Sequence, residues 1–302
     1  MKILVTGGAG FIGSHVVEAL LKEGHTPVVL DDLSNSKLVN LPHHVTVYRT
    51  DLLSNKVEKV FKKEQPEIVI HMAAQISITK SIADPTEDAA INVLGTIKLL
   101  SYCIKYDVKK IIFSSSSAVY GETSDNPIHE KTLTQPISFY GTSKLVSESY
   151  IQLFEKLYKL PYTILRYANV YGPRQKSDGE GGVISIFINN ILEGKSPTIY
   201  GDGLQTRDFV FVEDIANANL LALHHGENEI LNIGTTSATS ILQLHTLITQ
   251  LLHSSLTPAF EPMRDGDIFH SQLNHDKAKQ ALHWEPKVSL ATGIEKTIAF
   301  FD

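Results

Sequence analysis

Cysteine is almost absent from this sequence. Cys103 is the only cysteine among 302 residues, so an intramolecular disulfide cannot form and a zinc site built on cysteine is not expected. Chains with a free thiol and no disulfide are typical of reducing compartments. We therefore expect a cytoplasmic protein.

Excess positive charge is also missing. The 27 lysines and arginines are outnumbered by 33 aspartates and glutamates, for a net charge of -6. A protein with this balance has no general field that would neutralise nucleic-acid phosphates, so we expect no nucleic-acid partner. Any anionic ligand has to meet cations that are placed locally.

Long hydrophobic runs and metal-ligand spacings are lacking as well. The apolar run near the N-terminus stops at Gly7, which is too short for a signal peptide or a membrane helix. The 13 histidines include His43 and His44 but form no compact cluster with carboxylates, so we expect neither a metal site nor a membrane partner. With 42% hydrophobic residues, the chain can still bury a substantial core.

The sequence does contain a regular series of short apolar runs, most of them separated by helix-like segments. The runs cover residues 3–5, 27–30, 45–48, 68–71, 110–113 and 162–165. This alternation predicts an α/β fold with a Rossmann-type doubly wound parallel sheet. We expect this domain over residues 1–169. Residues 170–302 would mainly form a smaller α+β C-terminal substrate-binding domain, with about 207–235 returning to the first.

A glycine-rich turn follows the first predicted strand and precedes a helical pattern. Gly7, Gly10 and Gly13 would let the backbone approach a pyrophosphate, while the helix N-terminus supplies N–H groups and partial positive charge. Asp31 ends the second predicted strand, near the offset at which an acid meets the adenosine ribose. The combination predicts NAD rather than NADP.

Tyr140 and Lys144 are spaced to share one face of a helix. A nearby ammonium would stabilise the phenolate and lower the tyrosine pKa, which makes a base at neutral pH. Taken alone, this spacing more often marks two surface residues, but here it follows a nucleotide-binding loop. A run of serines after residue 113 offers a hydroxyl to hold a substrate, or a loop that caps itself.

These motifs together resemble the extended short-chain dehydrogenase/reductases, in particular the NAD-dependent nucleotide-sugar epimerase/dehydratase family typified by UDP-glucose 4-epimerase. The resemblance covers nearly the whole chain. It also includes the segments at 71–75, 165–175, 201–203, 207–209 and 264–267.

The resemblance implies roles for individual residues. Tyr140 would be the catalytic base and acid, Lys144 would tune it and bind the nicotinamide ribose, and Ser116 would orient the sugar hydroxyl. The implied NAD contacts are Gly7, Gly10, Phe11, Ile12, Gly13, Asp31, Asn35, Asp51, Leu52, Ala73, Ala74, Gln75, Asn92, Ser114, Tyr140, Lys144 and Tyr167.

The resemblance also implies a UDP-sugar site. Its implied contacts are Ser116, Tyr140, Asn169, Val183, Tyr200, Arg207, Arg264, Asp267 and Ser271. The two arginines would meet the phosphates, which suits the geometry of a guanidinium, and Asp267 would meet the uridine ribose. They are the local cations that the net charge requires. The small Ser271 stands where the family varies the size of the sugar pocket.

One departure separates the subfamilies. Sugar 4,6-dehydratases carry Asp-Glu directly after the active-site hydroxyl residue, where this chain has Ser117 and Ala118. The related decarboxylases carry a glutamate at the position of Ala118. Elimination and decarboxylation are therefore disfavoured, whereas epimerisation needs neither acid.

The resemblance thus predicts a 4-epimerase that interconverts UDP-glucose and UDP-galactose and keeps its NAD. A UDP-N-acetylglucosamine or UDP-glucuronate 4-epimerase and a net NAD-dependent oxidoreductase remain alternatives. A noncatalytic sensor is disfavoured because it needs no tuned tyrosine. Helical patterns at 89–103 and 145–157 fit either a homodimer interface, as in the family, or packing on the sheet.

Overall fold

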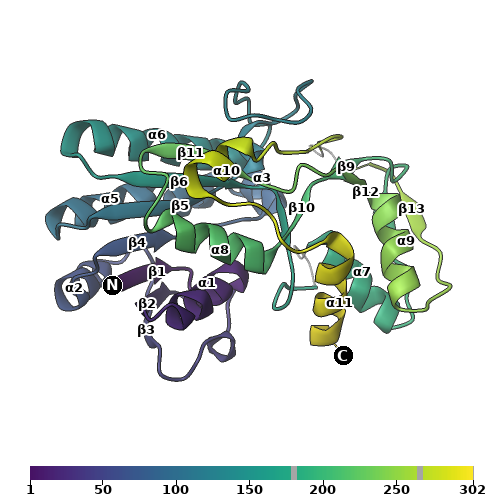
Figure 1. The fold of residues 1–302 in the computed structure, drawn as a ribbon, viewed down its shortest axis with the longest axis horizontal. Helices are drawn as coiled ribbons and strands as arrows, with labels where there is room; N and C mark the ends of the chain where they lie inside the picture. Colours follow the sequence, from purple (N-terminus) through teal and green to yellow (C-terminus); the bar gives the residue numbers. More distant parts are fainter. Residues whose placement is uncertain (178–181, 264–267, 302) are drawn as a thin grey trace.

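A seven-stranded parallel sheet forms the centre of the larger part of the molecule (Figure 1), which is described as a computed structural model over residues 1–177, 182–263 and 268–301. The strand order is β11-β6-β5-β4-β1-β2-β3. The bounds are β1 Lys2–Thr6, β2 Thr26–Asp31, β3 Thr46–Arg49, β4 Ile68–His71, β5 Lys110–Ser116, β6 Tyr162–Tyr167 and β11 Glu229–Ile233. The predicted α/β fold and the six predicted strands are confirmed.

Helices cover both faces of this sheet. On one face lie α1 (Phe11–Lys22), α8 (Val212–Ala222) and α10 (Asp276–Leu282), which share an apolar core with β1, β6 and β11. On the other face lie α2 (Lys56–Glu64), α5 (Gly95–Lys105) and α6 (Phe139–Tyr158), with a second core. Burial on both faces explains why the strands read as continuous apolar runs.

The strand order reverses between β1 and β4. The chain builds β1, β2 and β3 toward one edge and then returns to add β4, β5 and β6 on the other side of β1. The loops that follow β1 and β4 therefore run apart and leave a crevice at the carboxyl ends of the strands. A dinucleotide site is expected there.

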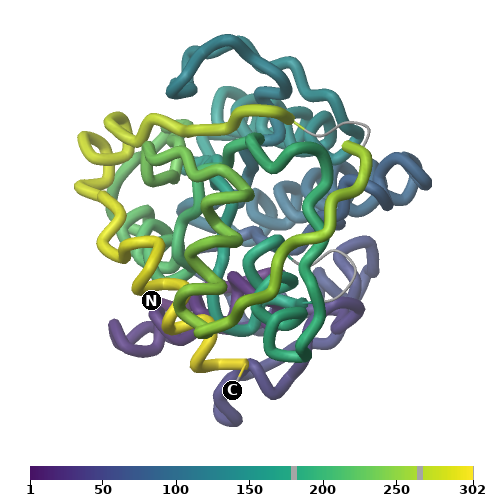
Figure 2. The backbone as a smooth tube through the Cα atoms, turned by 90° about the vertical axis from the view of Figure 1, so that its right-hand side faces the viewer, coloured from purple at the N-terminus to yellow at the C-terminus, as the bar shows by residue number. Residues whose placement is uncertain are grey.

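Later segments form a smaller lobe around a third apolar core (Figures 1 and 2). It contains α7 (Val183–Leu192), α9 (Ile241–Leu251), α11 (Leu290–Phe301) and the parallel pair of β8 (Thr198–Tyr200) and β13 (Ala259–Glu261). Two further strand pairs are β7 (Asn169–Tyr171) with β10 (Phe209–Phe211) and β9 (Thr206–Arg207) with β12 (Thr239–Ser240). The boundary at residue 169 stays a prediction.

Short helices complete the described chain. They are η1 (Leu38–Asn40), α3 (Ile78–Ala83), α4 (Pro85–Ala89), the π-helix η2 (Ala90–Leu94) and η3 (Ser117–Val119). None of the described helices is both long enough and apolar enough to span a membrane.

Candidate functional site

The glycine loop after β1 is fixed by close backbone packing. Gly7 has φ of 69°, and its N–H donates to the carbonyl of Leu30 at 2.8 Å. A Cβ at Gly7 would lie 2.8 Å from the nitrogen of Ala73, and a Cβ at Gly13 would lie 2.2 Å from the carbonyl oxygen of Gly7. Neither position can accept a side chain without moving the backbone.

The N-terminus of α1 faces the crevice without a protein cap. Gly10 is the N-cap residue, no side chain caps the helix, and its first turn contains no acid. A Cβ at Gly10 would meet only the carbonyl of Gly7, at 3.2 Å. Because the first-turn N–H groups of a helix need acceptors, this end fits a pyrophosphate.

Asp31, at the end of β2, binds the glycine loop itself. Its Oδ2 accepts from the N–H of Ala9 at 3.0 Å, and its Oδ1 accepts from the N–H of Leu33 at 2.9 Å and the hydroxyl of Ser36 at 2.6 Å. A carboxylate offers about four acceptor positions, so one position remains for a ribose hydroxyl. The acid therefore shapes the loop as well as fitting the predicted ribose contact.

Further predicted cofactor residues lie just after the carboxyl ends of other strands of the sheet. Asp51 is exposed and Leu52 is buried after β3, while the Ala73–Gln75 segment follows β4. Asn92 holds Gln75 at both backbone groups, since its Oδ1 accepts from the N–H and its Nδ2 donates to the carbonyl, each at 2.9 Å.

Asn35 lies on the loop after β2. It is exposed, and its Oδ1 accepts from Lys176 Nζ at 3.3 Å. This contact joins the predicted cofactor edge to the loop that follows β7.

The three predicted catalytic residues meet where β5 ends. Tyr140 and Lys144 lie in the first turns of α6, whose N-cap Ser138 accepts from the N–H of Gly141 at 3.1 Å. The hydroxyl of Ser116, at the end of β5, hydrogen-bonds the phenol of Tyr140. Lys144 Nζ lies 6.0 Å from the centre of the Tyr140 ring. The predicted helix is confirmed, and it brings the three side chains together.

Lys144 is almost fully buried under this pair. Its ammonium donates to the carbonyl of Ser114 at 2.8 Å and lies 4.8 Å from the centre of the Phe113 ring. Burial lowers the pKa of Lys144 to about 8. The lysine thus titrates much closer to neutrality than an exposed one.

The expected lowering of the tyrosine pKa is not found in the chain alone. Burial raises the pKa of Tyr140 to about 12, although the hydrogen bond from Ser116 acts in the opposite direction. Desolvation penalises the phenolate more than the neighbouring groups favour it. Activation of Tyr140 therefore needs a further positive charge at the site.

A buried polar network that sequence reasoning missed supports these residues from below. Glu148 on α6 accepts from the hydroxyl of Ser115 at 2.5 Å and from Arg166 on β6 at 3.0 and 2.6 Å. Arg166 also donates to the hydroxyl of Tyr120 at 2.9 Å. The signal that could have found Glu148 is its place one helical turn after Lys144.

A hydrogen bond between two hydroxyl groups joins the neighbouring strands β5 and β6 near their carboxyl ends. Ser114 and Tyr167, both predicted cofactor residues, lie 3.1 Å apart between their oxygens, and Tyr167 also accepts from Asn219 at 2.8 Å. The structure therefore links Tyr167 to Ser114, whose carbonyl accepts from Lys144.

His71 forms a second missed element at the end of β4. The hydroxyl of Thr6 accepts from the backbone of residues 72 and 73, so it donates to His71 Nδ1 at 2.7 Å, and Nε2 then donates to Thr96 at 2.9 Å. Thr96 in turn donates to the carbonyl of Asn92 at 2.6 Å. Burial lowers the pKa of His71 to about 3, so the ring is neutral.

The other described substrate candidates come from segments that follow β6 in the chain. Val183 begins α7, whose N-cap Gly182 provides no side-chain cap, while Tyr200 ends β8 and Asn169 begins β7 in an exposed position. Arg207 on β9 donates to the carbonyls of Thr206 at 2.9 Å and Phe269 at 3.5 Å.

The segment after residue 268 runs beside β9. The buried Ser271 donates its N–H to the carbonyl of Thr206 at 3.2 Å, which places it close to Arg207 in the fold. Arg264 and Asp267 lie outside the described residues.

A loop after β7 docks on α1. Arg174 donates to Glu18 at 2.5 Å and to Ser14 at 3.1 Å, and His15 Nε2 donates to the carbonyl of Pro173 at 3.0 Å. These contacts, which carry no sequence signal of their own, hold the loop against the helix that offers its N-terminus to the crevice.

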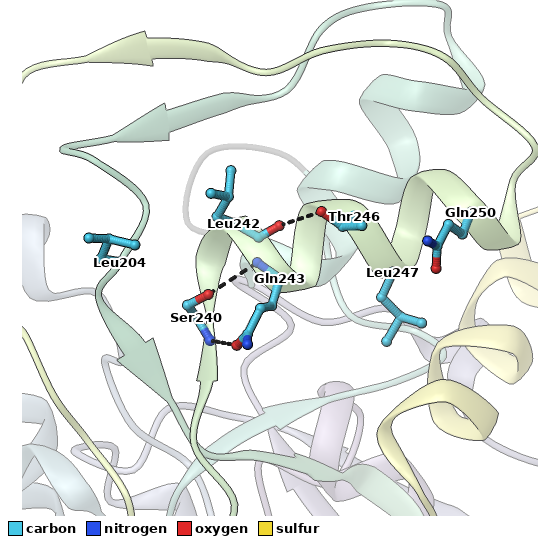
Figure 3. A pocket seen from close by; sticks show the side chains of 7 residues that line it. All are labelled: Leu204, Ser240, Leu242, Gln243, Thr246, Leu247 and Gln250. Atoms are coloured by element: carbon cyan, nitrogen blue, oxygen red, sulfur yellow. Dashed lines mark hydrogen bonds between the residues drawn. The ribbon is translucent and has the colours of Figure 1, made fainter.

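Two hollows in the described part of the chain, of about 410 and 320 Å³, contain none of the predicted site residues. The larger hollow lies on α9 (Figure 3), and its polar residues Ser240 and Gln243 bind each other in a capping box. Within the described ranges, no group of three His, Cys, Asp or Glu residues could hold a metal ion.

Fold and site together define a class of protein. A doubly wound sheet with an uncapped glycine loop, an acid after β2 and a Tyr-Lys pair beside a serine is the architecture of the short-chain dehydrogenase/reductases. Residues 3–234 match the family described as NAD-dependent epimerase/dehydratase. The chain belongs to this family, and NAD is its cofactor.

Relatives of known name match the chain over its whole length. A UDP-glucose 4-epimerase of Mycolicibacterium smegmatis is 39% identical over 308 residues, which cover 100% of this chain and 98% of that protein. The crystal structure of the UDP-glucose 4-epimerase of Thermotoga maritima with UDP-glucose is 45% identical, with a TM-score of 0.98 and coverage of 100% and 98%.

A relative with another substrate name is nearly as similar in fold. The UDP-N-acetylglucosamine 4-epimerase of Methanobrevibacter ruminantium, solved with UDP-N-acetylmuramic acid, is 36% identical, with a TM-score of 0.95 and coverage of 99% and 97%. Fold similarity therefore does not separate sugars.

Proposed function

We propose that this protein is a nucleotide-sugar 4-epimerase that interconverts UDP-glucose and UDP-galactose through a transient 4-keto sugar. The observation that carries the proposal is the convergence of Ser116, Tyr140 and Lys144 at the end of β5, beside the glycine loop. The names of the relatives in Mycolicibacterium and Thermotoga support the choice of sugar.

The residues of the chain supply proton transfer and orientation. When bound, NAD in its oxidised form supplies a hydride acceptor and a positive charge. The Tyr140 phenolate takes the proton of the C4 hydroxyl while C4 loses a hydride, and the Ser116 hydroxyl holds the sugar oxygen during this step. Return of the hydride to the opposite face of C4, and of the proton to the C4 oxygen, inverts C4, and no net oxidation occurs.

Lys144 stabilises the phenolate electrostatically. Its ammonium is fixed by the carbonyl of Ser114 and lies under the Tyr140 ring, so it is held in place without reorganisation. Because the pKa of Tyr140 is about 12 in the chain alone, the positive charge of the oxidised cofactor is the second contribution that the mechanism requires.

On this proposal, UDP would stay bound at one position while the sugar rotates. The guanidinium of Arg207 and the uncapped N-terminus of α7 at Val183 are the described groups suited to a diphosphate. Arg264 and Asp267 complete the proposal on the strength of the family resemblance.

A UDP-N-acetylglucosamine 4-epimerase is the second candidate. Ser271 is small and buried beside β9, and on the family resemblance a small residue at this position would admit an N-acetyl group; a relative of that name has a similar fold. UDP-glucuronate remains a further substrate to test.

We also propose a homodimer. Tyr150, Leu153 and Leu157 lie exposed at helical spacing along α6, and Leu94 is exposed at the end of η2, directly before α5 on the same face of the sheet. An apolar stripe of this kind is suited to pairing with its copy. A cytoplasmic location, which fits the free and buried thiol of Cys103, is part of the same proposal.

The test is a mass-spectrometric assay of purified protein without added NAD. UDP-glucose, UDP-N-acetylglucosamine and UDP-glucuronate are supplied in turn, the C4 epimers are separated, and NADH absorbance is followed, with Tyr140→Phe as the control. C4 epimers without net NADH support the proposal and rank the sugars. Stoichiometric NADH with an oxidised sugar would instead show a net oxidoreductase.

A further inference from the structure

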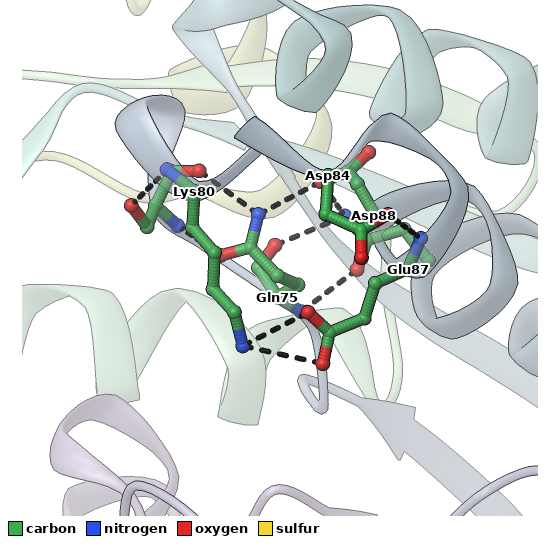
Figure 4. A network of polar contacts seen from close by, with 7 residues as sticks. Gln75, Lys80, Asp84, Glu87 and Asp88 are labelled. Carbon is green, nitrogen blue, oxygen red and sulfur yellow. Dashed lines mark hydrogen bonds and ion pairs between the residues drawn. The ribbon is translucent and has the colours of Figure 1, made fainter. Parts of the chain in front are cut away.

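Asp88 is a buried carboxylate to which the proposed reaction gives no role. It lies in α4 with only 1% of its surface exposed, and its Oδ1 accepts from Gln75 Nε2 at 2.9 Å and Asn92 Nδ2 at 3.1 Å (Figure 4). Its Oδ2 is also buried and takes no hydrogen bond from any residue the structure describes. An amide oxygen would satisfy both donors, so hydrogen bonding does not explain why the residue is an acid.

Asp88 is connected to the catalytic helix by one side chain. Asn92, which donates to Asp88, also donates to the hydroxyl of Ser143 at 3.0 Å. Ser143 lies between Tyr140 and Lys144 on α6 and donates to the carbonyl of Tyr140 at 3.0 Å. The carboxylate therefore lies one side chain away from the helical turn that carries the pair.

The widened turn of η2 makes this connection possible. Asn92 lies inside the π-helix, and its carbonyl accepts from Thr96 at 2.6 Å and from Ser147 at 2.9 Å. The backbone of Asn92 is thus fixed to α5 and α6, while its amide bridges Asp88 and Ser143. Such π-bulges are frequent at functional sites.

Most charges around Asp88 are already balanced. On α6, Glu148 is paired with Arg166, and on β4 the ring of His71 is neutral. On α3 and α4, Lys80 and Glu87 are exposed and lie 3.1 Å apart as an ion pair. Asp84, also exposed, caps α4.

Lys144 is the buried cation left facing Asp88. The described hydrogen bond of Lys144 goes to a neutral carbonyl. Burial lowers the pKa of Lys144, whereas the charge of Asp88 raises it. Both burial and the charge of Asp88 raise the pKa of Tyr140. The carboxylate therefore opposes the effect of burial on the lysine and adds to it on the tyrosine.

We propose that Asp88 is a positioning residue of the Tyr140–Lys144 pair, which acts through its buried charge to keep Lys144 an ammonium ion. This inference rests on the proposed function, because it assumes that Tyr140 is the base. The charge has a second consequence, since it disfavours the phenolate. Loss of the charge moves the ionisation of both groups to lower pH.

The experiment compares pH–rate profiles of epimerisation for three variants with wild type. In Asp88→Asn, both limbs of the profile move down by about one pH unit, the size expected when a unit charge is removed from a buried site near the pair. Glu87→Gln removes the same charge from the exposed side of α4 and leaves the limbs in place. Asp88→Glu keeps the charge, so both limbs of its pH–rate profile stay at the wild-type pH.

A merely structural role gives a different result. If D88N lowers the rate but its limbs stay at the wild-type pH, the inference is wrong. If D88N does not fold, Asp88→Ser takes its place, since it also removes the charge and is smaller.

A second measurement separates this inference from the proposed function. The phenolate of Tyr140 is titrated in the NAD-loaded protein by ultraviolet absorbance, as the difference between each protein and its Tyr140→Phe counterpart. If no UDP-sugar is epimerised, the proposed function fails, and the titration still decides on Asp88. A lower titration midpoint in D88N supports the electrostatic role, and an unchanged midpoint overturns it.

Discussion

The buried ion pair below the catalytic residues makes a sharp prediction about stability. The side chains of Glu148 and Arg166 are only 1% and 5% exposed. In Glu148→Gln, the amide oxygen can still accept from Ser115 and from Arg166 Nε, but the amide nitrogen replaces the oxygen that accepts from Arg166 Nη2 at 2.6 Å. Two donors then face each other, and the guanidinium keeps a charge without a counter-ion.

The expected cost is large for so small a change. Removal of one partner of a buried pair typically costs about 3–5 kcal/mol, because the other charge stays buried. Total unfolding free energies are about 5–15 kcal/mol, so Glu148→Gln should remove a substantial fraction of the stability. Glu285→Gln is the control, because its pair with Lys279 is more than half exposed on both sides and solvent screens it, so its loss should change the stability little.

Urea unfolding followed by circular dichroism, at a fixed NAD concentration, measures this difference. NAD must be fixed because a ligand of the native state adds to the apparent stability. The double variant Glu148→Leu with Arg166→Met removes both charges and should be more stable than Glu148→Gln. A loss of stability in Glu148→Gln no larger than that in the exposed control would refute the reasoning.

Further predictions address the base, the loop and the buried ring. Tyr140→Phe should lower turnover about 10²–10⁴-fold while NAD stays bound, as checked by assay and bound-nucleotide content. Binding of oxidised NAD should move the Tyr140 phenolate titration below its value of about 12, and an unchanged midpoint would contradict the mechanism. Gly13→Ala should reduce folded yield, because its Cβ would lie 2.2 Å from a backbone oxygen, whereas Gly10→Ala, with its nearest contact at 3.2 Å, should fold and weaken NAD binding in calorimetry. Between pH 6.5 and about 3, the unfolded chain binds a proton at His71 that the native chain does not. The free energy of unfolding should therefore decrease as the pH is lowered through this range, by up to about 1.4 kcal/mol per pH unit. The slope should be smaller in His71→Gln.

Local sequence signals were sufficient for most of the sheet. Its buried parallel strands read as short apolar runs, and glycine, helix and acid follow in the order that a nucleotide loop requires. β11 was not among the predicted strands, because Asn232 interrupts its apolar run. In the structure, this side chain is hydrogen-bonded by residues far away in the sequence. Tyr120 donates to the side-chain oxygen of Asn232 at 2.7 Å, and the side-chain amide of Asn232 donates to the carbonyl of Ile128 at 3.0 Å.

The polar support of the site was not predictable in the same way. Glu148 and Arg166 are 18 residues apart, and Gln75 and Asp88 are separated by 13, so their contacts exist only once helices have docked on the sheet. The ionisation of Tyr140 was missed for the same reason. A helical spacing places a lysine near it, but the desolvation that outweighs this lysine depends on everything packed around both.

The distribution of hydrogen bonds suits a reaction in which the substrate turns and the base does not. An epimerase returns hydride to the opposite face of the sugar, so on the proposed mechanism Tyr140 has to serve both faces from one position. Its helix is tied to the sheet through Lys144 with the carbonyl of Ser114 and through Glu148 with Arg166, both buried. Arg207, a proposed contact of the diphosphate, lies on the two-residue strand β9. On the proposed mechanism, buried hydrogen bonds therefore hold the base, where proton transfer needs a fixed geometry, and Arg207, on the proposed diphosphate, lies on a short strand.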